Sequence, residues 1–300
     1  MNIIRLMAKK PIWGLFMKKL FFPSLVLVSM MGLVACGNSD NGLVKNGKAF
    51  KDGETAKVSE EVKVATNGKV KSVTQKTTTT QTTKTAAGGK TETTKQSGSS
   101  TIKYNFETKT IEGKLSESGQ SLSFKAAQQA DGSFEYVTGG AAIREAMTPE
   151  TLALLYEAVQ VNIYSWNYES DASSILGSLG GFTGEIDASS IESLVELNDS
   201  LVSKMVISGD TAKGTFDVGI AEQFTFSLDL GSLFDSESEI GAILSLVGNV
   251  PLTVYKTKQS YKDGLLRSNV TAVKTEISLM GNTVVGDYSN TATFTYEMAK

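Results

Sequence analysis

Residues 224–230 read Phe224-Thr225-Phe226-Ser227-Leu228-Asp229-Leu230, so large apolar side chains alternate with polar ones. This period of two is typical of a β-strand that buries one face and exposes the other, and it predicts a strand at 223–230. Phe224 and Phe226 fall on the same face of that strand. We therefore expect them to share one environment, either a packed core or a binding pocket.

The same alternation recurs along the last two thirds of the chain. It predicts further strands at 101–112, 120–128, 133–138, 204–208, 214–219, 250–254, 273–279 and 292–298. Asp131-Gly132 favours a tight turn, and Gly281-Asn282 between two β-rich runs signals a two-residue hairpin. Such short links predict antiparallel pairing of consecutive strands.

A helix is expected after the first group of strands. Thr148 is a suitable N-cap, Pro149 suits the first helical position, and Glu150 complements the helix dipole at that end. The apolar residues that follow recur at helical spacing: Leu152, Leu155, Tyr156 and Val159. Residues 161–168 fit either an extension of this helix or a strand.

Two later helices complete the expected set. Asp187 is a suitable cap for one of them, and Ser236 with Glu239 forms a capping box for the other. Together these elements predict an α+β domain, with an antiparallel sheet of about eight or nine strands and about three short amphipathic helices. A curved, half-barrel-like sheet is compatible with this pattern. The glycine-rich stretch 174–184 matches no phosphate-binding fingerprint and predicts a flexible apolar loop.

The N-terminal segment has the three parts of a secretory signal peptide. Lys18 and Lys19 supply the basic part, residues 20–34 form the apolar run, and Leu33-Val34-Ala35-Cys36 ends it with small residues before a cut. This ending resembles the lipobox of bacterial lipoproteins. The resemblance implies that residues 1–35 are removed as a lipoprotein signal peptide and that the Cys36 thiol, at the new N-terminus, carries a diacylglyceryl group.

The resemblance also implies a location. We expect an exported, membrane-anchored lipoprotein, and Gly37 after the cysteine implies the outer membrane if the cell is Gram-negative. The apolar run is shorter than the roughly 20 residues of a transmembrane helix, so we expect contact with the membrane through the N-terminal lipid. Met17 is an alternative start to Met1, because the signal then begins cleanly with Met-Lys-Lys.

Residues 36–100 have the composition of a tether. Eleven of the twenty-one positions from Thr74 to Thr94 are Thr, and Phe50 is the only aromatic residue. Thr favours strands, but no apolar residue alternates with these threonines, so a strand here would have no apolar face to bury. We therefore expect a disordered Thr/Lys-rich tether over 36–100, ahead of a globular domain over 101–300.

The net charge of each segment and the lack of histidine and of further cysteines exclude several classes of function. Residues 36–100 carry a net charge of +5 and residues 101–300 a net charge of −13, and we expect no nucleic-acid binding from so acidic a domain. The chain has no histidine, and Cys36 is its single cysteine. This excludes His- and Cys-based catalytic triads and zinc sites with those ligands, so we expect no catalytic residue, no metal and no cofactor.

The residues leave three functions open. The first is an apolar-ligand or lipid carrier, loosely similar in architecture to the half-barrel carriers that move lipids and lipoproteins across bacterial envelopes. The second is a surface-displayed protein- or glycan-interaction module, with Trp166, Tyr164 and Tyr168 as candidate contacts. The third, a carboxylate-based hydrolase, is less favoured because no pair of acids stands out. The expectation is a non-enzymatic binding role, with no protein partner identified.

Cys36→Ser should release the protein from the membrane or stall its processing, because serine lacks the thiol that accepts the lipid. Membrane fractionation and the intact mass of the mature protein are the measurements, and the wild type should show an acylated Cys36. A mature chain that starts elsewhere and carries no lipid would contradict this expectation.

Overall fold

The computed structural model describes residues 42–49, 56–67, 69–117, 119–165, 203–229, 249–279 and 282–299 of the 300-residue chain. Several sequence predictions lie outside these ranges. They are the signal segment 1–35 with Cys36, the glycine-rich stretch 174–184, and the helices expected after Asp187 and Ser236.

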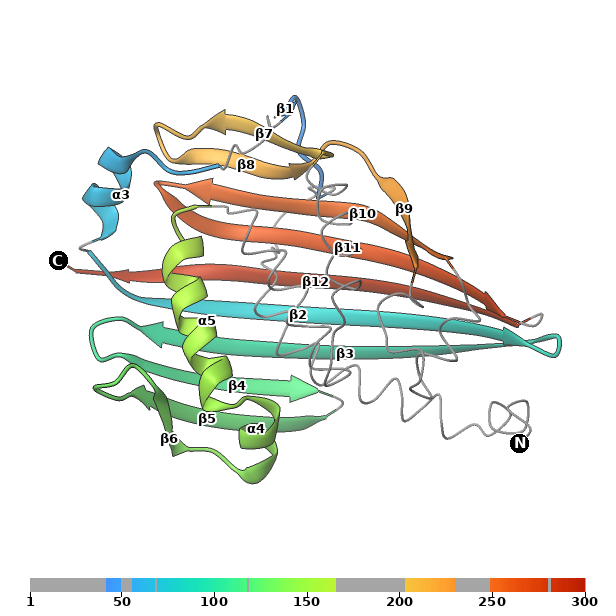
Figure 1. The fold of residues 1–300 in the computed structure, drawn as a ribbon, viewed down its shortest axis with the longest axis horizontal. Coiled ribbons are helices and arrows are strands. Elements are labelled where there is room, and N and C mark those ends of the chain that lie inside the picture. The colour runs from blue at the N-terminus through green and yellow to red at the C-terminus, as the bar shows by residue number, and fades with distance from the viewer. Residues whose placement is uncertain are drawn as a thin grey trace.

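One open sheet dominates the fold (Figure 1). Its 12 strands follow the order β1-β7-β8-β10-β11-β12-β2-β3-β4-β5-β6, with β9 also paired to β10. In chain order the elements are β1 (Lys48–Ala49), α3 (Glu60–Asn67), β2 (Val70–Ala87), β3 (Lys90–Asn105), β4 (Thr110–Glu117), β5 (Gln120–Gln128), β6 (Phe134–Thr138), α4 (Ala141–Ala146), α5 (Pro149–Asn162), β7 (Met205–Asp210), β8 (Thr215–Ile220), β9 (Phe224–Asp229), β10 (Asn249–Lys262), β11 (Leu265–Leu279) and β12 (Asn282–Met298). The sheet-rich α+β class with antiparallel pairing is confirmed, and the strand count is higher than expected.

The largest difference from the sequence prediction is the segment 36–100. It contains α3, β2 and most of β3, and the two strands lie in the middle of the sheet (Figure 1). β2 pairs with β12 from Val70↔Met298 to Ala86↔Thr283, and with β3 on its other side. The prediction of a disordered tether is therefore wrong for residues 70–100, and the folded domain begins well before Thr101.

β2 buries a polar face in place of an apolar one. Its central buried side chains are Gln75, Thr77 and Thr79, whereas the residues between them are exposed. The β-branched threonine side chain favours the extended backbone, and a neighbouring strand on each side supplies backbone hydrogen bonds. Gly88 and Gly89 close the β2–β3 hairpin with φ angles of 57° and 75°, as a two-residue turn of this kind requires.

The single strand expected at 101–112 is in fact two strands. β3 ends at Asn105, whose side-chain oxygen accepts hydrogen bonds from the backbone N–H groups of Glu107 and Thr108 at 3.0 and 2.9 Å. Lys109 then has a positive φ of 51°, and β4 begins at Thr110. This side-chain-stabilised turn interrupts the alternation that predicted one continuous strand.

The other expected strands are present, and β10, β11 and β12 extend well beyond their predicted ranges. The turn at Asp131-Gly132 is confirmed, with Gly132 at a φ of 91° and its N–H donating to the Gln129 carbonyl at 3.1 Å. β11 and β12 also form the expected hairpin. Leu279 lies opposite Asn282, so Asn282 begins β12 and is not a residue of the turn.

The helix expected after Thr148 is α5. The Thr148 hydroxyl accepts a hydrogen bond from the Thr151 N–H at 3.3 Å, and Pro149 is the first helical residue. α5 ends at Asn162, so the described part of 161–168 is the end of this helix followed by a β-bridge between Ser165 and Lys57. The short helices α3 and α4 were not expected.

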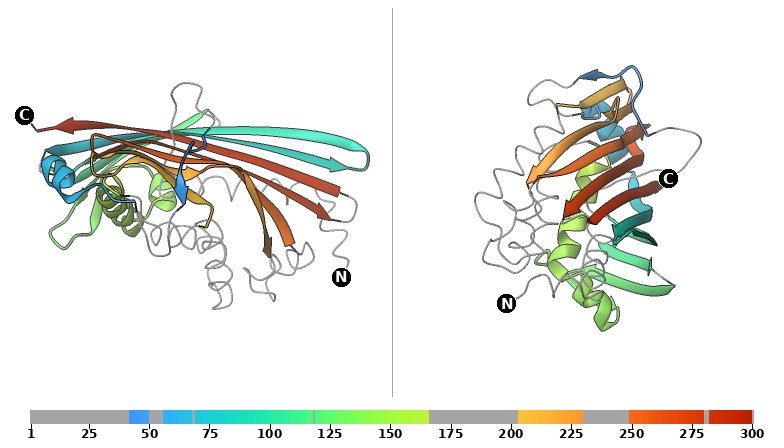
Figure 2. Two further views of the ribbon diagram at one scale, coloured as in Figure 1. Left: turned by 90° about the horizontal axis from the view of Figure 1, so that it is seen from above. Right: turned by 90° about the vertical axis from the view of Figure 1, so that its right-hand side faces the viewer.

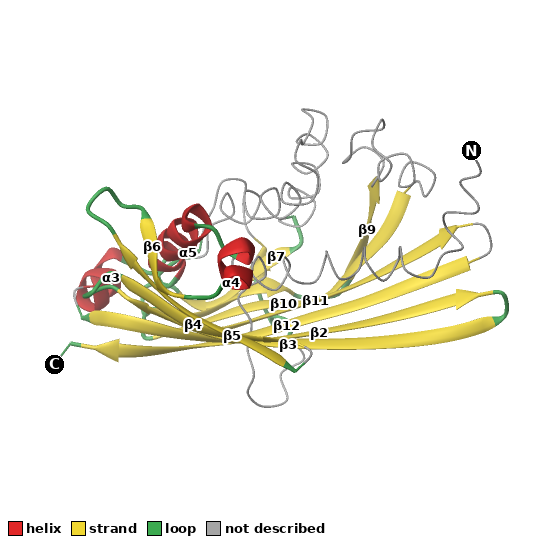
Figure 3. Ribbon diagram, turned by 90° about the horizontal axis from the view of Figure 1, so that it is seen from below, coloured by secondary structure: helices red, strands yellow, loops and turns green. Residues whose placement is uncertain are grey.

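The sheet is curved, and its helices lie on the concave side. Figures 2 and 3 show α3, α4 and α5 at one end of that side, where β12 finishes and β2 begins. At the other end, β9 and the adjoining ends of β10 and β11 curl towards the same side (Figure 3). β10 has a bulge between Val254 and Lys256. At the same place its outer partner changes from β9 to β8.

Removal of residues 37–100 should prevent folding. The shortened chain lacks β2, so β3 and β12 lose the strand that joins them. Thermal melts followed by circular dichroism should show a cooperative transition for a chain that starts at Cys36 and none for a chain that starts at Thr101. A chain that starts at Gly42 keeps every described residue and serves as the control. Equal melts for all three chains would contradict the central position of β2.

Candidate functional site

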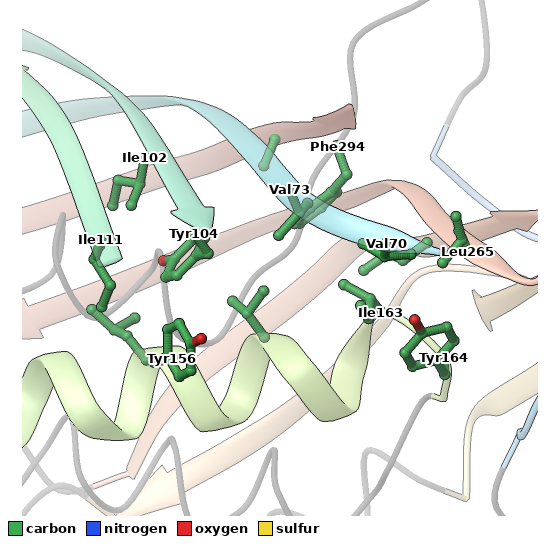
Figure 4. Packing of buried hydrophobic residues seen from close by; sticks show 14 of the residues in the cluster. Val70, Val73, Ile102, Tyr104, Ile111, Tyr156, Ile163, Tyr164, Leu265 and Phe294 are labelled. Atoms are coloured by element: carbon green, nitrogen blue, oxygen red, sulfur yellow. The ribbon is translucent and has the colours of Figure 1, made fainter. Parts of the chain in front are cut away.

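The concave face has two parts that differ in chemistry. At the helix end, α5 packs its apolar side onto β2, β3, β4 and β12 (Figure 4). The Tyr156 ring contacts the rings of Phe106 and Phe134, with centroids 5.6 and 5.3 Å apart, and Val73 and Tyr104 are completely buried beside them. This end of the concave face is a closed apolar core.

Tyr164 belongs to the same core. Its side chain is 5% exposed, and its carbonyl accepts a hydrogen bond from the Val58 N–H at 3.1 Å. Burial raises the pKa of Tyr164 to about 12. Tyr164 is therefore not the exposed contact that an interaction module would use, while Trp166 and Tyr168 lie outside the described residues.

Phe224 and Phe226 both belong to β9, two residues apart. They lie opposite Val254 and Leu252 of β10. Phe224 is half-buried and packs against the core, and Val254 is buried. The start of β9 therefore adds an apolar margin to the concave face, because directly paired residues point to the same side of a sheet.

Beyond the closed core, buried polar side chains cross five strands of the concave face. We call this group the polar band, and its members are Gln75, Thr77 and Thr79 of β2, Ser100 of β3, Asn290 of β12, Asn269 of β11 and Gln259 of β10. Each member is at most 6% exposed. Ser100 lies opposite Thr77, and the same row continues through Ala292 to Asn269 and Gln259.

Part of the polar band is hydrogen-bonded in the usual way for buried polar groups. Gln75 Nε2 donates to Thr77 Oγ1 at 3.3 Å. The Tyr261 hydroxyl lies 3.2 Å from both Gln259 Oε1 and the Asn162 carbonyl, which connects the band to the end of α5. These contacts fix the amide side chains at the helix side of the band.

Three buried hydroxyls at the band have no hydrogen-bond partner in the part of the chain that the structure describes. They are Thr79 Oγ1, Ser100 Oγ and, one row beyond Thr79, Tyr288 Oη. Gly98 lies opposite Thr79 and offers no side chain. A buried hydroxyl without a partner destabilises a protein by about 1–3 kcal/mol. Three such groups on one face mark the polar band as the candidate site, whereas the Tyr104 hydroxyl is a single such group in the closed core.

The buried surroundings change the pKa of the Tyr288 hydroxyl. Burial raises its pKa well above the ordinary value for tyrosine, and the neighbouring Thr79 hydroxyl opposes that rise to a smaller extent. The two hydroxyls are thus neighbours, although they do not meet the geometry of a hydrogen bond. Tyr288 stays protonated at neutral pH and can therefore donate a hydrogen bond.

In the middle of the sheet charged residues lie on the convex face, whereas Lys90 and Glu92 of β3 fall on the concave face next to the β2–β3 turn. The register leaves no Lys, Arg, Asp or Glu on the concave face of β2 from Val73 to Thr85, β3 from Thr94 to Tyr104, β12 from Val284 to Tyr296, or β11 from Asn269 to Thr275. The convex face carries ion pairs at Lys103–Glu297 (2.9 Å), Lys125–Glu112 (3.7 Å) and Lys258–Asp217 (3.0 Å). The candidate site is therefore buried, uncharged and rich in hydroxyl groups.

Two other kinds of feature are absent from the described ranges. No helix there is long and apolar enough to cross a membrane. Nor do those residues place three or more His, Cys, Asp or Glu side chains together in a group suited to a metal ion.

Comparisons with known proteins identify no family for this chain. No protein-family model matches it, and no curated protein matches it. Among solved structures, it is similar to a crystal structure of a DUF1329 family protein from Desulfovibrio piger at 9% identity, covering 79% of this chain and 91% of that chain. The TM-score is 0.14, which carries no argument about fold or function.

Thr79→Val should stabilise the ligand-free protein. Valine has nearly the shape of threonine, so the change removes a buried hydroxyl without a partner, and we expect a gain of about 1–3 kcal/mol in the free energy of unfolding. For a domain of this size, Tm rises by about 2–4 °C per kcal/mol. Thr78→Val, on the exposed face of β2, is the matched control and should shift Tm by less than about 2 °C. A lower Tm for Thr79→Val would show that the hydroxyl is hydrogen-bonded after all.

Proposed function

We propose that this protein is a lipid-anchored, exported lipoprotein of the bacterial envelope with a non-enzymatic binding role, and that its concave face holds an apolar or amphipathic small molecule such as a lipid. The observation that carries the proposal is the group of buried hydroxyls without partners at Thr79, Ser100 and Tyr288. Folded proteins rarely leave such groups unpaired. Oxygen atoms of a bound molecule would complete their hydrogen bonds.

The side chains around the polar band favour an elongated amphipathic molecule. On the helix side of the band, Ile102 and Phe294 lie opposite Gln75 on the two neighbouring strands. On the other side, Val273 lies opposite Tyr288, and Val284 lies on the same face of β12, four residues from Tyr288. A molecule that lies along the strands would meet apolar side chains before and after the hydroxyls, as lipid-binding sites require.

The proposed anchor would keep the domain close to the membrane. The Gly42 carbonyl accepts a hydrogen bond from the Thr257 N–H of β10 at 3.1 Å, so the chain is fixed to the sheet from this residue on. Cys36 precedes Gly42 by six residues, and an extended chain of that length spans at most about 20–22 Å. A lipid on Cys36 would therefore hold the domain beside the bilayer, where lipid exchange is direct.

The alternatives have less support. An interaction module loses Tyr164 as a contact, because that side chain is buried. A carboxylate hydrolase needs paired acids in a cleft, whereas Glu112 and Glu297 lie on the convex face beside lysines, as in an ordinary solvated surface. We therefore favour the carrier over both.

Native mass spectrometry of the full chain from its own host should show a non-covalent adduct with the mass of a lipid. Ser100→Leu should abolish the adduct, because its larger apolar side chain fills the polar band and removes a hydroxyl. Ser99→Leu, on the exposed face of the same strand, should retain it. Both variants keep Cys36. Any lipid that co-purifies in the detergent micelle around the N-terminal anchor should therefore be the same in both, and a difference between them reports binding at the polar band.

Circular dichroism melts accompany the experiment to confirm that both variants fold. Thr77→Leu in the band and Thr78→Leu on the exposed face repeat the comparison if Ser100→Leu does not fold. A wild-type protein without an adduct, or equal adducts in band and surface variants, would contradict the carrier proposal.

A further inference from the structure

The polar band offers only uncharged groups to a ligand. Its hydroxyl and amide side chains can donate and accept hydrogen bonds, but they carry no charge. Arg267, near the helix end, is already engaged: its guanidinium lies 5.2 Å from the Tyr296 ring centroid and 3.4 Å from the Asp263 carboxylate. Lys103 is likewise paired with Glu297 on the convex face.

An anionic head group would bind poorly in such a place. Transfer of a phosphate or carboxylate from water to a buried site costs several kcal/mol unless a cation pairs with it. Hydroxyl, ester and glycosidic oxygens are uncharged, and each can form an ordinary hydrogen bond with Thr79, Ser100 or Tyr288. The chemistry of the band therefore discriminates between neutral and anionic amphipathic molecules.

We infer that the ligand is a lipid with an uncharged head group that carries hydroxyl or ester oxygens. Thr79, Ser100 and Tyr288 hydrogen-bond these oxygens, and the absence of a cation from the polar band disfavours anionic lipids. This inference rests on the proposed carrier function. A diacylglycerol and a glycosyl-diacylglycerol share this chemistry. They differ in whether the oxygens come from the glycerol alone or also from a sugar.

The chain provides a matched pair of tyrosines for the test. Tyr104 and Tyr288 both have a buried hydroxyl without a partner among the described residues. Tyr104 lies in the closed core above α5 (Figure 4), opposite Val73 and Ile111, whereas Tyr288 lies beside the polar band. Tyr104→Phe and Tyr288→Phe thus remove the same atoms from two different surroundings.

The experiment measures displacement of a fluorescent diacylglycerol from the delipidated full chain in detergent micelles. The competitors are dioleoylglycerol, its monoglucosyl derivative and dioleoyl phosphatidylglycerol, which share their acyl chains. We expect the dissociation constants of the two neutral lipids to be at least about tenfold lower than that of the anionic lipid. A tenfold ratio corresponds to the free energy of about one hydrogen bond. The comparison of the two neutral lipids shows whether the sugar takes part.

Tyr288→Phe and Thr79→Val should weaken the binding of the two neutral lipids about three- to tenfold, while Tyr104→Phe should leave it unchanged. Equal or tighter binding of phosphatidylglycerol by the wild type would overturn the inference and leave the carrier function standing. An equal loss of affinity for the neutral lipids in Tyr104→Phe would overturn the role of Tyr288 and Thr79. Failure of the probe and all three lipids to bind would overturn the carrier function itself.

Discussion

The pairing of β2 with β12 is the interaction on which the rest of the sheet depends. Ser72 and Glu297, whose side chains are joined by a hydrogen bond of 2.6 Å, are 225 residues apart in the chain. β2 to β6 pair in sequence order, as do β10 to β12, and the β2–β12 pairing joins these two runs in the described sheet. Because it joins residues 225 positions apart in a 300-residue chain, its entropic cost is large and local hairpins should form before it.

The sequence predicted the elements whose burial follows apolar periodicity. α5 has both the Thr148 cap and an apolar stripe, and β5 to β9 show the alternation of half-buried strands. β2 escaped prediction because its inward positions are Gln75, Thr77 and Thr79, and apolar alternation cannot reveal a strand that buries amides and hydroxyls. Its remaining signals were local ones: the strand preference of threonine and a Gly88-Gly89 turn between two Thr-rich runs.

The candidate site could not be predicted for a different reason. Thr79 is one of many threonines, and its hydroxyl has no partner among the described residues, with Gly98 opposite it on β3 and Asn290 opposite it on β12. Those neighbours are set by a register between distant segments, which no local pattern encodes. The sequence suggested that apolar side chains line the sheet face, and the structure shows that the middle of that face is polar.

The polar band lies across the same pairing that holds the sheet together. Ser100 and Thr77 come from one half of the sheet, and Asn290, Asn269 and Gln259 come from the other. A molecule bound to the band would contact both halves, so its binding free energy would add to the stability of the β2–β12 pairing. Apolar residues in these positions would give a more stable empty sheet, because they remove unpaired hydroxyls. The stability of the empty sheet alone therefore does not explain hydroxyls at its most critical pairing, whereas the proposed ligand would.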